Sequence, residues 1–348
     1  MRGAARNWVV SGALVVAAIA APLLLPEFQV QLTLLWILIV FALTWDLLGG
    51  QMGYNSFGNV IFSGIGVYAA TIVQIGLYHD VAAYTSAYGT VTLSFTPSQY
   101  FTGLFVGLVV APLIAVPVAA VLGSGVLGMR GQYFAVATLG LGIAGGELAA
   151  AWGYLGGAFG IQVPVFPGPV ETRRLFFYGL SAVLGVATFL FCGWLYGTRF
   201  GLALNAIRDD EDKAESMGLR TTRYKILAWC ISAFFLSLAG GLLGHIIGVI
   251  EPREVAFAGT SYGVWMVLMP ILGGKGTLWG PVLGAVIFDV TKELFWTYLF
   301  GWQRVAFGLL IVVIIVFFPV GILGWARARF PALFGYRVEA RPARGAGQ

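Results

Sequence analysis

The sequence predicts an all-α polytopic membrane protein with about eight to ten transmembrane helices, some of them broken or half helices. The chain has 348 residues, of which 59% are hydrophobic and 10% charged, and its mean hydropathy is +0.88. A soluble domain of this size cannot bury so large an apolar share. Apolar runs of about 20 residues also recur along the chain, each long enough to cross about 30 Å of hydrocarbon as a helix.

Ten apolar runs mark the candidate helices: 8–26, 31–49, 57–77, 102–122, 133–152, 176–197, 226–250, 261–272, 279–299 and 303–323. The run 261–272 is too short to cross alone, so we expect a half helix or a re-entrant element there. The first run follows Arg2 and Arg6 and is interpreted as a signal anchor rather than a cleaved signal sequence, because further membrane segments follow it. The predicted organisation is an N-terminal anchor helix over 1–30, a transmembrane domain over 31–325 and a basic tail over 326–348.

The basic residues are distributed unequally between the two predicted sides of the membrane. If the N-terminus is cytoplasmic and the segments alternate, Arg130, Lys275, the loop 199–225 and the C-terminal tail fall on the cytoplasmic side, with most of the 20 lysines and arginines. Cytoplasmic loops carry such an excess, so both termini are predicted to be cytoplasmic. These bases flank membrane segments and form no patch interleaved with aromatic residues, so we expect no nucleic-acid partner.

The reactive side chains indicate neither a metal site nor a catalytic site. Cys192 and Cys230 lie in separate apolar runs without a CxxC pair, and His79 and His245 form no metal-binding motif. No catalytic pair occurs at a suitable spacing, which disfavours an intramembrane enzyme.

Few charged residues lie within the apolar runs. Asp289 and Lys292 are three apart on one helical face and can neutralise each other. Asp46 and Glu147 have no obvious partner nearby in the sequence. Two isolated acids are weak support for a gradient-driven transporter or channel, which would need a clearer ion site.

The loop 199–225 contains six consecutive charged residues, Arg208 to Lys213. Charge runs usually mark solvated loops, but apolar residues recur here at roughly helical spacing, namely Phe200, Ala203, Leu204, Ile207, Ala214 and Met217. Such a stripe must be buried against the chain's own helices or a partner. Thr198 can cap the start and Gly218 can end the helix in a left-handed conformation, and Asp209 with Asp212 resembles a weak capping box that would divide the loop into two short helices.

A second distinctive stretch, residues 49–66, combines six glycines with short polar side chains: Gln51, Asn55, Ser56, Asn59 and Ser63. Irregular backbone at membrane depth is tolerated where it is buried or lines a water-filled cavity, so one interpretation is a broken helix beside a translocation path. The alternative is close helix packing through small residues. Gly273 and Gly274 begin a similar segment, and Val286-Ile287-Phe288 after it echoes Val60-Ile61-Phe62, which hints at an internal repeat.

The stretch GTRFGLALNAIRDDEDKAESMGLRTTRYK, residues 197–225, resembles the coupling loop of LivM-type permeases, the membrane subunits of ATP-binding-cassette importers for branched-chain amino acids. The resemblance continues through residues 130–142, 231–244 and 272–285 and covers most of 45–323. Importer permeases in general carry an EAA-x3-Gly pattern in this loop. Only Ala214 and Gly218 match that pattern outright, so the likeness is to the branched-chain subfamily.

The resemblance implies that the loop docks onto a separate ATPase subunit, with contacts from Leu204, Ile207, Arg208, Asp209, Glu211, Ala214, Met217 and Gly218. The chain lacks GxxxxGK[ST], so ATP would be bound by the partners and this chain would hold no cofactor. The implied partners are two ATPases, a second related permease, most simply as a heterodimer with a homodimer as the alternative, and an external amino-acid-binding protein. The implied location is the bacterial cytoplasmic membrane. Permeases for urea and short-chain amides are close relatives and give the alternative substrate.

Overall fold

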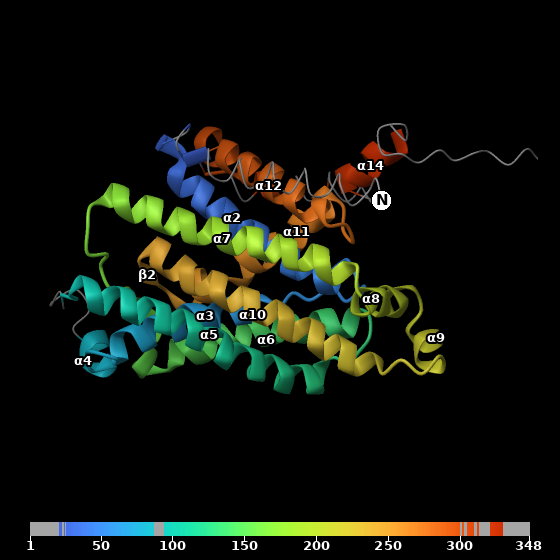
Figure 1. The fold of residues 1–348 in the computed structure, drawn as a ribbon, viewed down its shortest axis with the longest axis horizontal. Coiled ribbons are helices and arrows are strands. Elements are labelled where there is room, and N and C mark those ends of the chain that lie inside the picture. Colours follow the sequence, from blue (N-terminus) through green and yellow to red (C-terminus); the bar gives the residue numbers. More distant parts are fainter. Residues whose placement is uncertain are drawn as a thin grey trace, which may run out of the picture.

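The computed structural model describes residues 21–22, 24, 26–86, 94–299, 301–302, 305–309, 312 and 321–329. Long helices run roughly side by side along the long axis of the molecule (Figure 1). The predicted anchor run 8–26, the last apolar run 303–323 and the basic tail 326–348 lie mostly outside the described residues.

The elements follow one another in this order: η1 Pro26–Phe28, α2 Gln29–Gly49, α3 Val60–Gly76, α4 Val81–Ser86, α5 Pro97–Val126, α6 Gln132–Ala151, η2 Gly153–Leu155, η3 Gly157–Phe159, β1 Ile161–Gln162, α7 Val170–Tyr196, α8 Arg199–Asp209, α9 Glu211–Ser216, α10 Thr221–Ile247, β2 Val249–Ile250, η4 Pro252–Ala256, η5 Gly259–Gly263, α11 Val264–Gly273, α12 Trp279–Tyr298 and α14 Gly321–Arg329. The segments η4 and η5 are π-helical.

The all-α membrane fold is confirmed. Within the described residues six helical segments are long and apolar enough to cross a membrane. The 17-residue α3 and the more charged α12 are further helices that are not among these six. The short run 261–272 does not stand alone, because η4 and η5 precede α11 and extend it to a 22-residue span from Pro252 to Gly273. The predicted half helix is therefore the regular part of a broken one.

The loops gather at two opposite ends of the bundle (Figure 1). At one end α8 and α9 lie against the segments that follow α2 and α5, since Arg208 reaches Gly50 and Arg130 reaches Asp212. At the other end β1 pairs antiparallel with β2, Ile161 opposite Ile250. Arg130 and the loop 199–225, which were predicted to lie on one side of the membrane, therefore meet at one end of the bundle.

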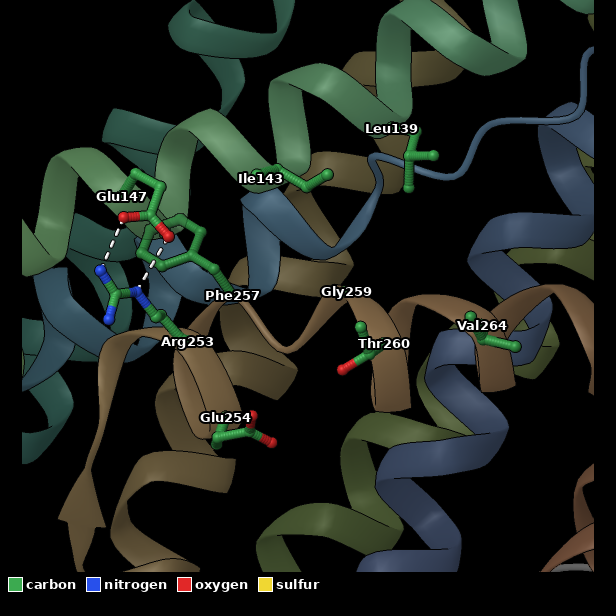
Figure 2. Close-up of a pocket in the computed structure, with 10 residues that line it drawn as sticks. Leu139, Ile143, Glu147, Arg253, Glu254, Phe257, Gly259, Thr260 and Val264 are labelled. Carbon is green, nitrogen blue, oxygen red and sulfur yellow. Dashed lines mark hydrogen bonds and ion pairs between the residues drawn. The ribbon is translucent and has the colours of Figure 1, made fainter. Parts of the chain in front are cut away.

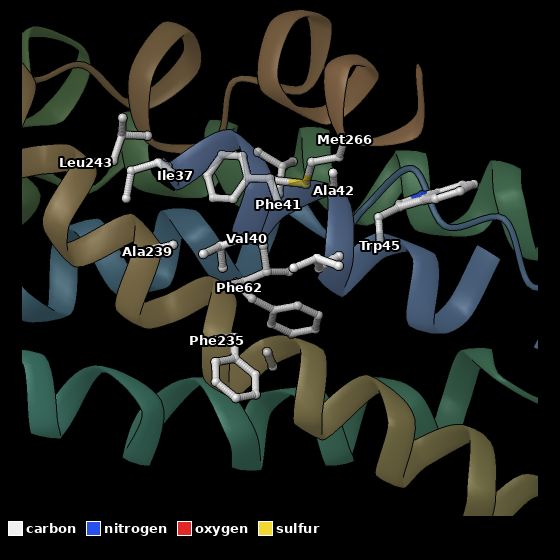
Figure 3. Close-up of a cluster of buried hydrophobic side chains, with 14 of the residues drawn as sticks. Ile37, Val40, Phe41, Ala42, Trp45, Phe62, Phe235, Ala239, Leu243 and Met266 are labelled. Carbon is white, nitrogen blue, oxygen red and sulfur yellow. The ribbon is translucent and has the colours of Figure 1, made fainter. Parts of the chain in front are cut away.

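Helix α2 occupies the centre of the bundle and is buried from Trp36 to Gly49. It packs against α7, α10, α11 and α12, and its side chains Val40 and Phe41 meet Phe62 of α3, Phe235 of α10 and Met266 of α11 in one apolar cluster (Figure 3). A helix enclosed on all sides needs apolar residues all round, which explains the nearly unbroken apolar run 31–49.

Small residues bring α3 and α10 into close contact. A Cβ at Gly66 would lie 2.0 Å from the Ser237 carbonyl oxygen, and one at Gly240 would lie 2.1 Å from that of Ser63. Larger side chains would force the two backbones apart. Close helix packing, the alternative considered for the glycines of 49–66, therefore accounts for Gly66.

Candidate functional site

The loop between α7 and α10 folds as two short helices, as predicted. The Thr198 hydroxyl accepts a hydrogen bond from the Gly201 amide at 3.5 Å and caps α8. The cap of α9 is Asp210, whose carboxylate accepts from the Lys213 amide at 3.1 Å, so the predicted capping box on Asp209 and Asp212 is wrong by one residue. After α9, Gly218 has a φ of +89°, the left-handed conformation expected of it.

The apolar stripe of the loop divides between two directions. Leu204, Ile207 and Ala214 are buried within the chain, where α8 contacts α7 and α10. Met217, in contrast, is 86% exposed. The loop thus rests on its own helices through most of the stripe and presents Met217 outward.

Glu211 is the anchor of α9 rather than an outward-facing residue. Its Oε1 lies 2.6 Å from the Lys225 Nζ, and the side chains of Glu211 and Lys225 are only 11% and 2% exposed. Lys225 also donates to the Tyr54 hydroxyl at 3.0 Å, and that hydroxyl donates to the other oxygen of Glu211. Arg130 Nε completes the group 3.5 Å from Glu211.

The electrostatics of this group favour an ionised Glu211 beside a neutral Tyr54. Burial disfavours the Glu211 carboxylate, but the hydrogen bonds from Lys225 and Tyr54 and the charges of Lys225 and Arg130 outweigh it, so the pKa of Glu211 lies below its ordinary value. Burial and the neighbouring Glu211 raise the pKa of Tyr54. We call Tyr54, Arg130, Glu211 and Lys225 the anchor cluster.

Sequence reasoning missed three members of the anchor cluster. Tyr54 lies in the glycine-rich stretch, Arg130 follows α5, and Lys225 ends the TTRYK segment. The available signal was a lysine at the start of a membrane helix, where an unpaired buried charge would be costly. Which acid it pairs with depends on the path of the loop, which the sequence does not define.

The outer surface of α8 and α9 is strongly charged. Asp209, Asp212 and Lys213 are exposed. Asp212 contacts Arg130 at 2.6 Å, Asp209 contacts Arg208 at 3.1 Å, and Lys213 contacts Asp210 at 2.8 Å. Two apolar side chains of the loop are exposed as well, Leu202 and Met217. We call the exposed side chains of Asp209, Asp212, Lys213 and Met217 the outer face of the loop.

Arg208 connects the loop to both glycine-rich segments. Its Nη1 donates to the Gly50 carbonyl oxygen at 3.5 Å. The Gly276 amide donates to Asp46 Oδ1 at 2.8 Å. Gly276 also lies close to Gly50 and Arg208, because a Cβ added to it would be 3.1 Å from the Gly50 carbonyl oxygen and 3.5 Å from Arg208 Nη1. The break after α2 and the break after α11 therefore meet beneath α8.

The polar residues predicted to line a translocation path lie mostly inside the chain. Gln51, Ser56, Asn59 and Ser63 are buried, and Asn55 is exposed. Asn59 accepts a hydrogen bond from the Trp229 indole at 2.8 Å, which is a packing contact. Their role in a path remains a prediction.

Gly273 and Gly274 are also buried. A Cβ at Gly273 would lie 1.8 Å from the Gly280 carbonyl oxygen, so this residue allows α11 and α12 to meet closely. A path-lining role for the pair likewise remains a prediction.

The three acids singled out in the apolar runs, Asp46, Glu147 and Asp289, each have a partner. Asp46 accepts from Gly276 as described above, and Glu147 forms a double hydrogen bond with Arg253 at 2.9 and 2.7 Å. Asp289 and Lys292 contact each other at 2.6 Å, as predicted. In the part of the chain that the structure describes, no group of three or more His, Cys, Asp or Glu residues could hold a metal ion.

Comparison with known proteins identifies the family. Residues 28–319 match the family model described as branched-chain amino acid transport system / permease component. The high-affinity branched-chain amino acid transport system permease protein LivM of Salmonella typhimurium is 26% identical over 338 residues, which cover 85% of this chain and 76% of the relative. LivM of Escherichia coli is 26% identical over 328 residues, covering 85% and 73%.

A second group of relatives carries the name LivH. LivH of Salmonella typhimurium is 34% identical over 151 residues, 42% of this chain and 47% of the relative. No solved structure matches. The family match covers most of the chain, and the chain therefore belongs to the permease components of branched-chain amino acid transport systems.

Proposed function

We propose that this chain is a membrane-spanning permease subunit of an ATP-driven, binding-protein-dependent importer of branched-chain amino acids in the bacterial cytoplasmic membrane. The observation that carries the proposal is the loop α8–α9, which is anchored on the chain's own helices and exposes a charged outer face with a projecting Met217. The names of the relatives, LivM and LivH, support the substrate class and a second related permease as partner.

The outer face has the composition of a docking surface. When a partner covers such a face, its exposed apolar side chain supplies burial and its charged side chains supply orientation. We infer that the partner is an ATPase subunit, one for each of two permeases, and that ATP binds there and not in this chain. The loop and both chain termini would then face the cytoplasm, in agreement with the excess of basic residues on that side.

The contacts of Arg208 suggest how ATPase motion reaches the membrane helices. A displacement of α8 would be carried by Arg208 to the Gly50 carbonyl and, beside it, to Gly276 and Asp46. These positions lie where α2 and α11 end. Helix ends without regular hydrogen bonding can change backbone angles at low cost, so the two breaks are suited to act as hinges.

The test is uptake by membrane vesicles that contain this chain with its ATPases, second permease and binding protein. We expect ATP-dependent uptake of leucine, isoleucine and valine, and no uptake of urea. Asp209→Lys together with Met217→Asp should abolish both ATPase association and uptake, because both residues belong to the outer face. Glu171→Lys, an exposed acid on α7 at the opposite end, is the matched control and should leave both intact.

Two results would contradict the proposal. Uptake of urea in place of leucine would identify the short-amide branch of the family. Normal ATPase association by the outer-face variant would show that α8–α9 is not the docking element.

A further inference from the structure

A pocket lies between α6 and the broken helix formed by η4, η5 and α11. It has a volume of about 250 Å³ and is lined by residues of these elements, among them Glu147, Arg253, Ile143, Phe257, Gly259 and Val264. Drug-sized ligands usually occupy roughly 300–1,000 Å³. This smaller pocket suits a molecule of the size of a free amino acid.

The chemistry of the lining is divided along the pocket (Figure 2). Glu147 and Arg253 face each other at one end, from α6 and η4. Leu139 and Val264 lie toward the other end, and Ile143 and Phe257 lie between. One end therefore offers an adjacent positive and negative charge, and the apolar side chains line the rest together with two further polar residues, Glu254 and Thr260.

The Glu147–Arg253 pair is accessible to a ligand. Its side chains are 55% and 53% exposed, although the two hydrogen bonds between them are well formed at 2.9 and 2.7 Å. Exposed ion pairs add little to folding stability. A zwitterion placed between the two groups would keep both charges paired, with its carboxylate on the guanidinium and its ammonium on the carboxylate.

The backbone beside the pocket is irregular in a way that fits a binding role. The segments η4 and η5 are π-helical turns within a predicted membrane span. Such turns are rare and often occur at functional sites, and irregular backbone at membrane depth is tolerated where it is buried or lines a cavity.

We propose that this pocket is a transit site on the import path, which holds an amino acid with its carboxylate on Arg253, its ammonium on Glu147 and an apolar side chain against Ile143, Phe257 and Val264. The inference rests on the proposed function and deepens it, because it gives this chain its own contact with the substrate. The pocket would select zwitterions with apolar side chains. It would disfavour uncharged amides, because they have no charged groups to pair with Glu147 and Arg253.

The test uses the complete transporter in vesicles, with the binding protein at saturating concentration and the leucine uptake rate as readout. Arg253→Gln should lower this rate about tenfold, as expected for loss of one charge-assisted contact. The double variant Glu147→Arg with Arg253→Glu keeps an ion pair but exchanges the positions of the charges. A purely structural pair would tolerate the exchange, whereas the transit site requires that it lower uptake as well.

A second variant tests the apolar part of the pocket. A Cβ at Gly259 meets no heavy atom within 4 Å, so Gly259→Leu starts its side chain in open space at the pocket wall. We expect the ratio of leucine to valine uptake to fall roughly tenfold, the effect that one methylene can have in a filled apolar pocket. Gly153→Leu is the matched control, because a Cβ there also meets open space and the residue does not line the pocket.

Arg174→Gln controls for loss of an exposed arginine, since Arg174 lies on α7 outside this pocket. The amount of assembled complex and its basal ATPase rate show whether each variant folds. If the wild-type complex imports leucine and the charge-exchange variant imports it at an unchanged rate, the transit site is wrong and the proposed function stands. An unchanged leucine-to-valine ratio for Gly259→Leu would likewise contradict the apolar part of the site. If the wild-type complex imports no branched-chain amino acid, the proposed function fails and the site fails with it.

Discussion

Two acid–base pairs connect helices in different parts of this molecule, and they differ in burial far more than in length. The Glu211–Lys225 contact is 2.6 Å long, with side chains 11% and 2% exposed. The Glu147–Arg253 contact is 2.7 Å long, with side chains 55% and 53% exposed. The first pair is further held by Tyr54 and Arg130, and the second lies at the edge of a pocket.

This difference separates an anchor from a binding site. A buried ion has lost its hydration, so removing its partner leaves an uncompensated charge and the fold loses stability. An exposed ion keeps water as an alternative partner, so its contacts can be exchanged for those of a ligand at little cost. We therefore expect mutations of the first pair to affect folding and mutations of the second to affect transport.

The largest effect is expected for Lys225→Met, which leaves Glu211 partly buried without its main partner. The free energy of unfolding should fall by about 3 kcal/mol, measured by denaturant titration of the purified chain in detergent. Lys213→Met is the matched control, because Lys213 is exposed and its ammonium contacts Asp210, the N-cap residue of the same short helix; it should leave the unfolding midpoint unchanged. Equal stability of the two variants would mean that the anchor cluster does not hold the loop.

A smaller effect is expected from acid. The pKa of Glu211 in the folded protein is lower than its ordinary value, so its ionised form stabilises the fold at neutral pH. That contribution is complete above the ordinary glutamate pKa and is lost as the pH falls through the lower folded value. In Glu211→Gln the corresponding part of the acid destabilisation should be absent when unfolding midpoints are compared between pH 7 and pH 3. Identical pH profiles for the variant and the wild type would contradict this assignment.

The sequence predicted the membrane fold because apolar length and composition are properties of single segments. The two-helix loop and its Thr198 and Gly218 ends were predictable for the same reason, since capping depends on neighbouring residues. The anchor cluster and the pocket were not predictable in this way, because residues distant in the sequence, such as Tyr54, Arg130 and Glu211, are brought together by tertiary packing. Glu147 illustrates the limit: it had no partner nearby in sequence, and its partner Arg253 lies 106 residues away.

The smallest effect on stability is expected for Glu147→Gln, at the exposed pair. Water can replace the carboxylate around Arg253, so the unfolding midpoint of the purified chain should remain that of the wild type within error. The same variant removes the group proposed to hold the substrate ammonium, so leucine uptake by the complete transporter should fall while stability is unchanged. A loss of stability as large as that of Lys225→Met would show that burial does not separate the two pairs, and Glu147 would then be a structural residue like Glu211.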